Sequence, residues 1–148
     1  MFRSKTMILA GAVLALAITS SACSKKGPNS SGVNVEYNNA LKTIHFNFDK
    51  YNVRSEDAPL MQQNASWLKA NPNVNVIVEG NTDERGTNEY NMALGERRAK
   101  AGKDYLVNLG IDANRVSTVS FGEERPVNPG HDETAWFQNR RDDFAVRI

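Results

Sequence analysis

Three charged side chains in this sequence could form one binding site, namely Asp49, Asp83 and Arg98. Asp49 follows the apolar segment that ends in FNF, and Asp83 follows the segment VIVEGNT. An arginine can hold a carboxylate through two parallel hydrogen bonds, and an aspartate can hold an ammonium. Together the three residues would suit a zwitterion, which is a ligand with one negative and one positive end.

Arg98 occupies a position at which an apolar residue is expected. On a helical wheel of about 100° per residue, one apolar stripe is expected to face a sheet. The stripe comprises Tyr90, Leu94, Ala101, Tyr105 and Leu109. Arg98 falls inside it and Arg97 lies towards its edge. An unpartnered guanidinium against a core would cost several kcal/mol, so an anion should meet Arg98. The pattern leaves open whether this anion is an internal carboxylate or a ligand.

The elements that would position these residues alternate between strands and helices. The predicted strands span residues 43–48, 74–80, 115–122 and 143–148, and the predicted helices span residues 55–71, 88–109 and 134–139. Ser55 is the expected N-cap of the first helix, and Gly110 the expected C-cap of the second. This order predicts an α/β fold, a βαβαβ(α)β sandwich with helices packed on one face of a mixed sheet.

The first predicted strand is expected to turn Ile44, Phe46 and Phe48 inward. If this strand and the next run parallel, Asp49 and Asp83 lie at the same edge of the sheet. Open α/β sheets place their ligands at this edge. Taken singly, each aspartate is also typical of a turn.

Residues 1–22 have the pattern of an export signal. Two basic residues precede an apolar run over 7–18, and this run is shorter than the roughly 20 residues that cross a bilayer. Cys23 follows small residues and is the only cysteine, so it cannot form an internal disulfide. It resembles a bacterial lipobox cysteine, although Ser20 stands where a lipobox usually has Leu. The resemblance implies lipidation of Cys23, and cleavage that leaves a free thiol is the alternative.

The mature chain divides into a tether and one domain. Residues 23–34 are polar and rich in Ser, Gly and Asn, which predicts a flexible tether, and residues 35–148 have the usual length of one domain. Without residues 1–22, 16 of the 18 basic residues remain against 17 acidic ones. This balance argues against a nucleic-acid partner, which would require a basic surface.

The chain offers no ordinary metal site. Its two histidines and single cysteine cannot build a usual zinc site. His45 and His131 are expected at the surface. We expect no metal and no cofactor.

Five segments resemble the OmpA-like C-terminal domain family. They are FNFDKYNVRSED, VEGNTDERGTNEYNMALGERRAKA, YLVNLGI, VSFGEERPV and NRRDDF. The resemblance implies non-covalent binding of peptidoglycan through the meso-diaminopimelate of the stem peptide, whose side chain ends in one ammonium beside one carboxylate. Matching by position implies that the ligand site consists of Phe48, Asp49, Thr82, Asp83, Leu94 and Arg98.

The resemblance also implies a location and protein partners. The implied location is the outer membrane, in which the lipid on Cys23 would be anchored while the domain faces the periplasm. The implied partners are the proteins TolB and TolA. Ser24 after the cysteine agrees with outer-membrane sorting in the enterobacterial pattern. The sequence departs from the family at Asn81, where His is common, at Gly102, where a β-branched residue is common, and at Asp142, where an apolar residue is common. Gly102 is expected to cost the helix up to about 1 kcal/mol relative to Ala.

Two other functions fit some of the same residues. A peptidoglycan-modifying enzyme would use a carboxylate pair drawn from Asp49, Glu79, Asp83 and Glu84. An arginine between the acids keeps them ionised, which suits binding better than acid catalysis. We therefore expect that the protein is not an enzyme and has no catalytic residue. A structural docking partner of Tol proteins would use the same edge only as a contact surface. Arg140 and Arg141 are expected to pair with nearby acids.

Overall fold

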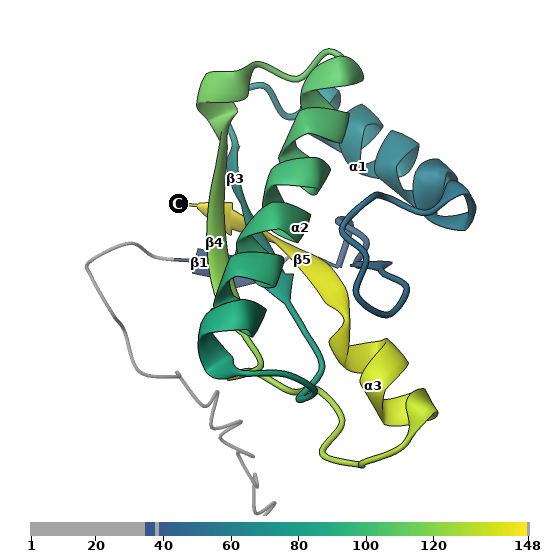
Figure 1. Ribbon diagram of the computed structural model, residues 1–148. Helices are drawn as coiled ribbons and strands as arrows, with labels where there is room; N and C mark the ends of the chain where they lie inside the picture. Colours follow the sequence, from purple (N-terminus) through teal and green to yellow (C-terminus); the bar gives the residue numbers. More distant parts are fainter. Residues whose placement is uncertain (1–34, 38, 148) are drawn as a thin grey trace, which may run out of the picture.

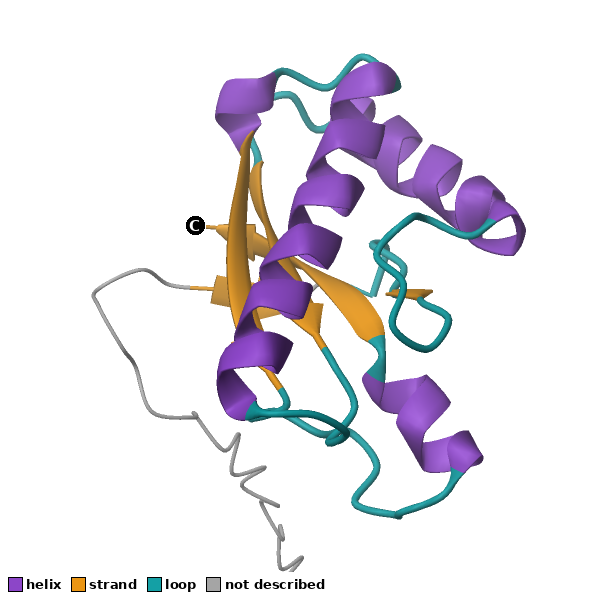
Figure 2. Ribbon diagram, in the orientation of Figure 1, coloured by secondary structure: helices purple, strands orange, loops and turns teal. Residues whose placement is uncertain are grey.

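The computed structural model describes residues 35–37 and 39–147, and its centre is a five-stranded mixed sheet (Figure 1). The strands are β1 (Val35–Tyr37), β2 (Ile44–His45), β3 (Asn75–Asn81), β4 (Val116–Gly122) and β5 (Arg141–Arg147). The helices are α1 (Ala58–Ala70), α2 (Asn88–Asn108) and α3 (Glu133–Asn139), with 3-10 turns η1 (Ser55–Asp57) and η2 (Ala113–Arg115). Helices α1 and α2 cover one face of the sheet (Figure 2), which confirms the predicted sandwich.

Strand direction brings the two predicted aspartates to one edge. The sheet has the order β1-β5-β3-β4, and β2 also pairs with β5. Strands β1, β2 and β3 are antiparallel to β5, and β3 is parallel to β4, so β5 alone is reversed. Ile44 of β2 and Gly80 of β3 both align with Asp142. The loops that follow β2 and β3 therefore leave the sheet at the same level, as the sequence predicted.

The core lies between the sheet and the helices. It contains fully buried side chains from β2, β3, α1 and α2. Among them are Ile44, Val76, Val78, Met61, Leu68, Ala99 and Leu106. Alternate residues of β3 supply this face because successive strand side chains point to opposite sides.

Helix α2 approaches β3 closely because glycines face each other. A Cβ atom on Gly80 would lie 1.9 Å from the carbonyl oxygen of Gly95, and a Cβ atom on Gly95 would lie 2.3 Å from Oγ of Ser120. Such distances exclude any side chain at these two positions. Arg98 follows Gly95 by about one helical turn, so it is pressed against the edge of the sheet.

Several predicted details are wrong. The first predicted strand is regular only over Ile44–His45, and Phe48 is 55% exposed instead of facing inward. Ser55 opens the 3-10 turn η1, and α1 has Asp57 at its N-cap position. The last strand begins at Arg141 rather than Asp143 because β2 pairs with its first two residues.

The predicted stripe of α2 is partly wrong as well. Leu94 and Arg98 are buried, but Tyr90 is 45% exposed. The buried face also contains small residues that the wheel did not weigh, including Gly95, Ala99 and Gly102. Helix α2 has Leu109 at its C-cap, and the predicted capping glycine, Gly110, follows it with a φ of 93°.

Candidate ligand-binding site

A pocket of about 250 Å³ lies where the loops after β2 and β3 meet the first half of α2. Its walls are formed by Phe48, Asp49, Thr82, Asp83, Arg85, Gly86, Tyr90, Asn91, Leu94, Arg98 and Arg140. All six residues that the sequence assigned to a ligand site are among them. The fold therefore brings these six residues together although Phe48 and Arg98 are 50 positions apart in the chain.

Arg98 is held by the backbone of one loop, which follows β2, and of strand β3. Its side chain is fully buried, and it donates to the carbonyl oxygens of Lys50 at 2.8 Å, Asn81 at 2.9 Å and Asn47 at 3.3 Å. Its guanidinium also lies 5.0 Å from the centre of the Phe46 ring. A guanidinium has five N–H donors, so two remain without a partner among the described residues, which is the number that a carboxylate accepts in a bidentate pair.

Within the described part of the chain, Arg98 has no carboxylate partner at ion-pair distance. Among residues 35–37 and 39–147, no ion pair within 4.0 Å involves its guanidinium. Burial lowers the pKa of Arg98 to about 10, and the charges of Asp142 and Asp83 only partly oppose this shift. The positive charge is thus buried, fixed in place and able to accept an anion from the pocket.

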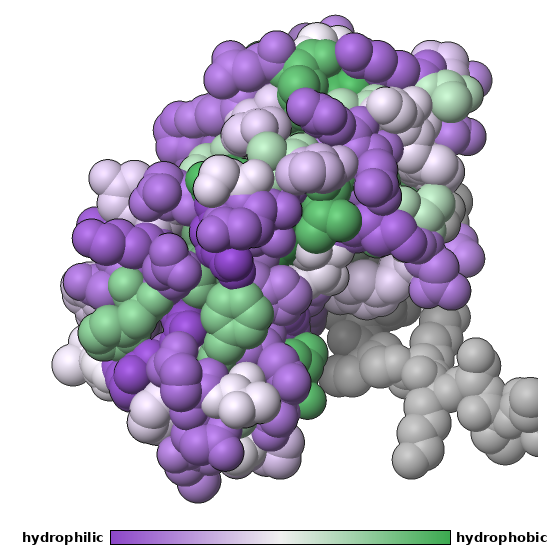
Figure 3. All heavy atoms as spheres, turned by 90° about the vertical axis from the view of Figure 1, so that its right-hand side faces the viewer, coloured by the Kyte–Doolittle hydropathy of each residue, from purple (hydrophilic) through white to green (hydrophobic). Residues whose placement is uncertain are grey.

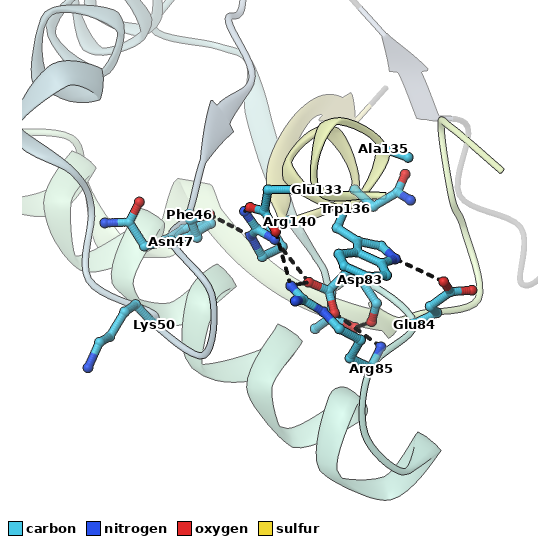
Figure 4. A network of polar contacts seen from close by, with 12 residues as sticks. Phe46, Asn47, Lys50, Asp83, Glu84, Arg85, Glu133, Ala135, Trp136 and Arg140 are labelled. Carbon is cyan, nitrogen blue, oxygen red and sulfur yellow. Dashed lines mark hydrogen bonds and ion pairs between the residues drawn. The ribbon is translucent and has the colours of Figure 1, made fainter. Parts of the chain in front are cut away.

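Asp83 lies between two guanidinium groups (Figure 4). Its Oδ2 accepts from Arg85 at 2.6 Å and from Arg140 at 3.1 Å, while its Oδ1 accepts from the backbone N–H of Arg85 at 3.1 Å. Burial alone would raise the pKa of the Asp83 carboxyl, but these hydrogen bonds outweigh burial and lower the pKa below its usual value. Asp83 is therefore a carboxylate, and it is the negative group deepest in the pocket wall.

Arg140 joins α3 and β5 to this site. It donates to the carbonyl oxygen of Phe46 at 2.9 Å and pairs with both Asp83 and Glu133. Arg141 lies 2.8 Å from Asp143. The prediction that both arginines pair with nearby acids is confirmed, although Arg140 also forms part of the pocket wall.

Asp49 lies at the outer side of the pocket in an unusual backbone conformation. Its φ of 54° is in the left-handed region, where aspartate is better tolerated than most other residues. The hydroxyl of Tyr90 donates a hydrogen bond to Oδ1 of Asp49. This bond raises the pKa of Tyr90. Tyr90 thus connects α2 to the loop after β2, which explains why it does not face the sheet.

Five residues of the pocket wall were absent from the prediction, namely Arg85, Gly86, Tyr90, Asn91 and Arg140. Asn91 could have been found from the sequence, since it precedes Arg98 by seven residues and so lies on the same helical face. It is buried, and its amide donates to the carbonyl oxygen of Asp83 at 3.3 Å. No sequence pattern indicated Arg85, because its position depends on the aromatic rings of Phe48 and Trp136, which come from other parts of the chain.

One face of the molecule is mainly hydrophilic (Figure 3). On the side of the molecule that is at the right in Figure 1, hydrophobic residues form separate patches rather than one continuous area (Figure 3). Phe48, Tyr51 and Tyr90 are large apolar side chains with about half of their surface exposed. In residues 35–37 and 39–147, no group of three or more His, Cys, Asp or Glu side chains could hold a metal ion.

A known protein family matches this part of the chain. The model of the OmpA family matches residues 45–140, which is more than half of the chain. The chain belongs to the OmpA family. The match begins in β2 and ends at Arg140, so it includes every residue of the pocket wall.

Similar proteins from other bacteria align with most of the chain. The peptidoglycan-associated lipoprotein of Haemophilus influenzae is 46% identical over 143 residues, which are 93% of this chain and 94% of that protein. The protein of the same name from Pasteurella multocida is 48% identical over the same shares. None of these names describes an enzymatic activity, in agreement with the prediction that the protein is not an enzyme.

Solved structures of other proteins share the fold. The crystal structure of the peptidoglycan-associated lipoprotein from Burkholderia pseudomallei matches with a TM-score of 0.68 and 46% identity, covering 70% of this chain and 88% of that chain. The C-terminal domain of Helicobacter pylori MotB matches with a TM-score of 0.67 but only 18% identity, covering 73% and 86%. The second likeness concerns the fold alone.

The predicted signal and the predicted lipid site at Cys23 lie outside the described residues. Within the described part of the chain, no helix has the length and apolar character needed to span a membrane.

Proposed function

We propose that this protein binds peptidoglycan non-covalently by holding the free amino acid end of diaminopimelate in the pocket. One observation carries the proposal: Arg98 is a buried cation that has two N–H donors to spare and lies in the same pocket as Asp49 and Asp83. A ligand carboxylate would pair with Arg98, and the neighbouring ammonium would bind the aspartates. The names of two similar proteins, which describe association with peptidoglycan, support peptidoglycan as the larger molecule that is bound.

The remaining residues of the predicted site suit the rest of this ligand. Phe48 and Leu94 are apolar and line the pocket, so they would contact the methylene groups between the two ends of diaminopimelate. Thr82 contributes a hydroxyl that already donates to the carbonyl oxygen of Asp83 and thereby helps to order the loop. The site would then recognise both the charges and the length of the side chain.

The biological role in this proposal is a tether between the outer membrane and the cell wall. Residues 1–22 would be removed as a signal, Cys23 would carry the lipid, residues 23–34 would span the gap, and residues 35–148 would bind the wall from the periplasm. Two or more acyl chains would make the anchor stable. TolB and TolA are the proposed protein partners, in the Tol-Pal system that supports envelope integrity and cell division, with TolB using a surface that overlaps the pocket.

The test is a sedimentation assay with purified sacculi. The domain should cosediment with sacculi that contain meso-diaminopimelate, and free diaminopimelate should release it in proportion to its concentration. A parallel sample with sacculi that contain lysine at the same position of the stem peptide is the matched control. Equal binding to both kinds of sacculi would contradict the proposed ligand.

A further inference from the structure

Arg85 forms an ion pair with Asp83, which is one of the carboxylates that the proposed function assigns to the ligand ammonium. Its Nη2 lies 2.6 Å from Oδ2 of Asp83, and its backbone N–H donates to Oδ1 of the same side chain at 3.1 Å. The two residues are separated by only one position in the chain, so this contact forms within the loop after β3. The side chain of Arg85 also contributes to the pocket wall.

Two aromatic rings hold the guanidinium of Arg85 in this place. It lies 4.0 Å from the centre of the Phe48 ring and 4.1 Å from the centre of the Trp136 ring. Both distances are within the range of cation–π attraction. The arginine is thereby sandwiched between the loop after β2 and helix α3, which the close view shows for Trp136 and Arg85 (Figure 4).

The two guanidinium groups on Asp83 differ in their freedom to move. The Arg140 side chain is only 3% exposed and also donates to the carbonyl oxygen of Phe46, so it is part of the framework. The Arg85 side chain is 30% exposed, and its Nε is buried without a hydrogen-bond partner among the described residues. An unmade buried hydrogen bond disfavours the conformation that contains it. Arg85 is therefore the cation that can leave.

A second carboxylate can receive Arg85 when it leaves. Oε2 of Glu133 lies 3.7 Å from Nη2 of Arg85, and this glutamate is 65% exposed. A small rotation of the arginine towards Glu133 would keep its charge paired while releasing Oδ2 of Asp83. Arg140 would remain on Asp83 and keep the carboxylate ionised.

We propose that Arg85 is a competing internal cation, and that binding of the ligand exchanges its guanidinium on Asp83 for the ligand ammonium. This inference rests on the proposed function. The exchange makes the site selective for ligands that carry a cation beside their carboxylate, because a ligand without an ammonium gains nothing from displacing Arg85. Arg98 binds the carboxylate in either case. A stronger Arg85–Asp83 ion pair then means a weaker affinity of the pocket for the ligand.

The experiment compares two synthetic stem tripeptides by calorimetry. One contains diaminopimelate, and the other contains 2-aminopimelate, whose free end has the carboxylate but no ammonium. The variants are Arg85→Gln, which removes the competing charge, and Arg97→Gln as the matched control. Arg97 is also an arginine over two aromatic rings, at 5.8 Å from the centres of both Tyr51 and Tyr90, but it does not line the pocket. Circular dichroism establishes that each variant is folded.

Arg85→Gln should bind the diaminopimelate peptide about twofold to fivefold more tightly than the original protein does, as expected for removal of one partly exposed ion pair that competes with the ligand. Its affinity for the 2-aminopimelate peptide should stay the same or fall, and Arg97→Gln should change neither. Unchanged or weaker binding of the diaminopimelate peptide by Arg85→Gln would overturn the inference while leaving the proposed function in place. Absence of binding by the original protein would overturn the proposed function and the inference together.

Discussion

A Cβ atom on Gly102 would lie 2.8 Å from Oδ2 of Asp142, so the glycine of α2 leaves the space that this buried carboxyl of β5 occupies. The family resemblance implies other residues at both positions, and the structure shows that Gly102 and Asp142 are neighbours. Asp142 is fully buried, and neither of its carboxyl oxygens has a hydrogen-bond partner among the described residues. The absence of a side chain at Gly102 therefore makes room for the buried carboxyl group of Asp142.

Gly102→Ala should destabilise the domain by about 1 to 3 kcal/mol because the added methyl group overlaps Asp142 and lies 3.1 Å from Cγ1 of Val78. This overlap outweighs the gain of up to about 1 kcal/mol that alanine normally brings to a helix. Adding Asp142→Ala should recover most of the loss, with a coupling free energy of about 1 kcal/mol or more. Urea unfolding of both single variants and the double variant measures this coupling, and additive changes would refute it.

Asp142→Asn should change how stability depends on pH. Burial raises the pKa of the Asp142 carboxyl well above its usual value, and Arg98 only partly opposes the shift. The unfolded chain therefore releases this proton near pH 4, whereas the folded protein retains it to higher pH. The contribution of Asp142 to stability is full below about pH 4 and is lost as the pH rises towards the pKa in the folded state.

Asparagine has the shape of the protonated carboxyl but cannot ionise, so the variant should escape this loss. Its free energy of unfolding, relative to that of the original protein, should increase between about pH 4 and pH 7. Urea unfolding at several pH values measures the difference, and Asp143→Asn is the control on the opposite face of β5. A difference that stays constant over this range would contradict the assignment.

Arg98→Ala should weaken sacculus binding by about 2 to 5 kcal/mol, since it removes a shielded partner of the ligand carboxylate. Arg98→Lys should not restore binding, because an ammonium lacks the planar fork and cannot satisfy three backbone carbonyls and a carboxylate together. Arg97→Ala should change binding by well under 1 kcal/mol. Folding must be verified for each variant, as loss of Arg98 leaves three carbonyl oxygens without this donor. Comparable damage from Arg97→Ala in folded protein would contradict the assignment of Arg98.

Expression in a bacterium that processes lipoproteins should yield a mature chain that starts at Cys23. Mass spectrometry of its N-terminal peptide should detect acyl chains on this residue, and Cys23→Ala should abolish them and release the protein from the membrane fraction. An unmodified thiol at Cys23 would remove the lipid anchor from the proposed function.

The sequence alone determined the alternation of strands and helices and the presence of Arg98 on a buried face. Both follow from local periodicity, because a strand alternates its side chains every two residues and a helix repeats about every 3.6. The wheel selected Arg98 rather than Arg97, and the structure confirms this choice, since Arg98 is buried and Arg97 is exposed. The prediction that Asp49 and Asp83 share an edge required only that β2 and β3 run parallel.

The tertiary structure decided the exact face of α2 and the partners of the charges. The wheel weighted large apolar residues and so placed Tyr90 inward, whereas the close approach of Gly80 and Gly95 turns the small residues of α2 towards the sheet. Such an approach depends on two backbones from different segments, which no local pattern records.

The same reason applies to the pairs that tune the site. Arg140 and Asp83 are 57 residues apart, and Asp142 meets Gly102 only because β5 is inserted between β2 and β3. Periodicity predicts which side chains are buried, but the chemistry of a buried charge depends on what the folded chain places opposite it.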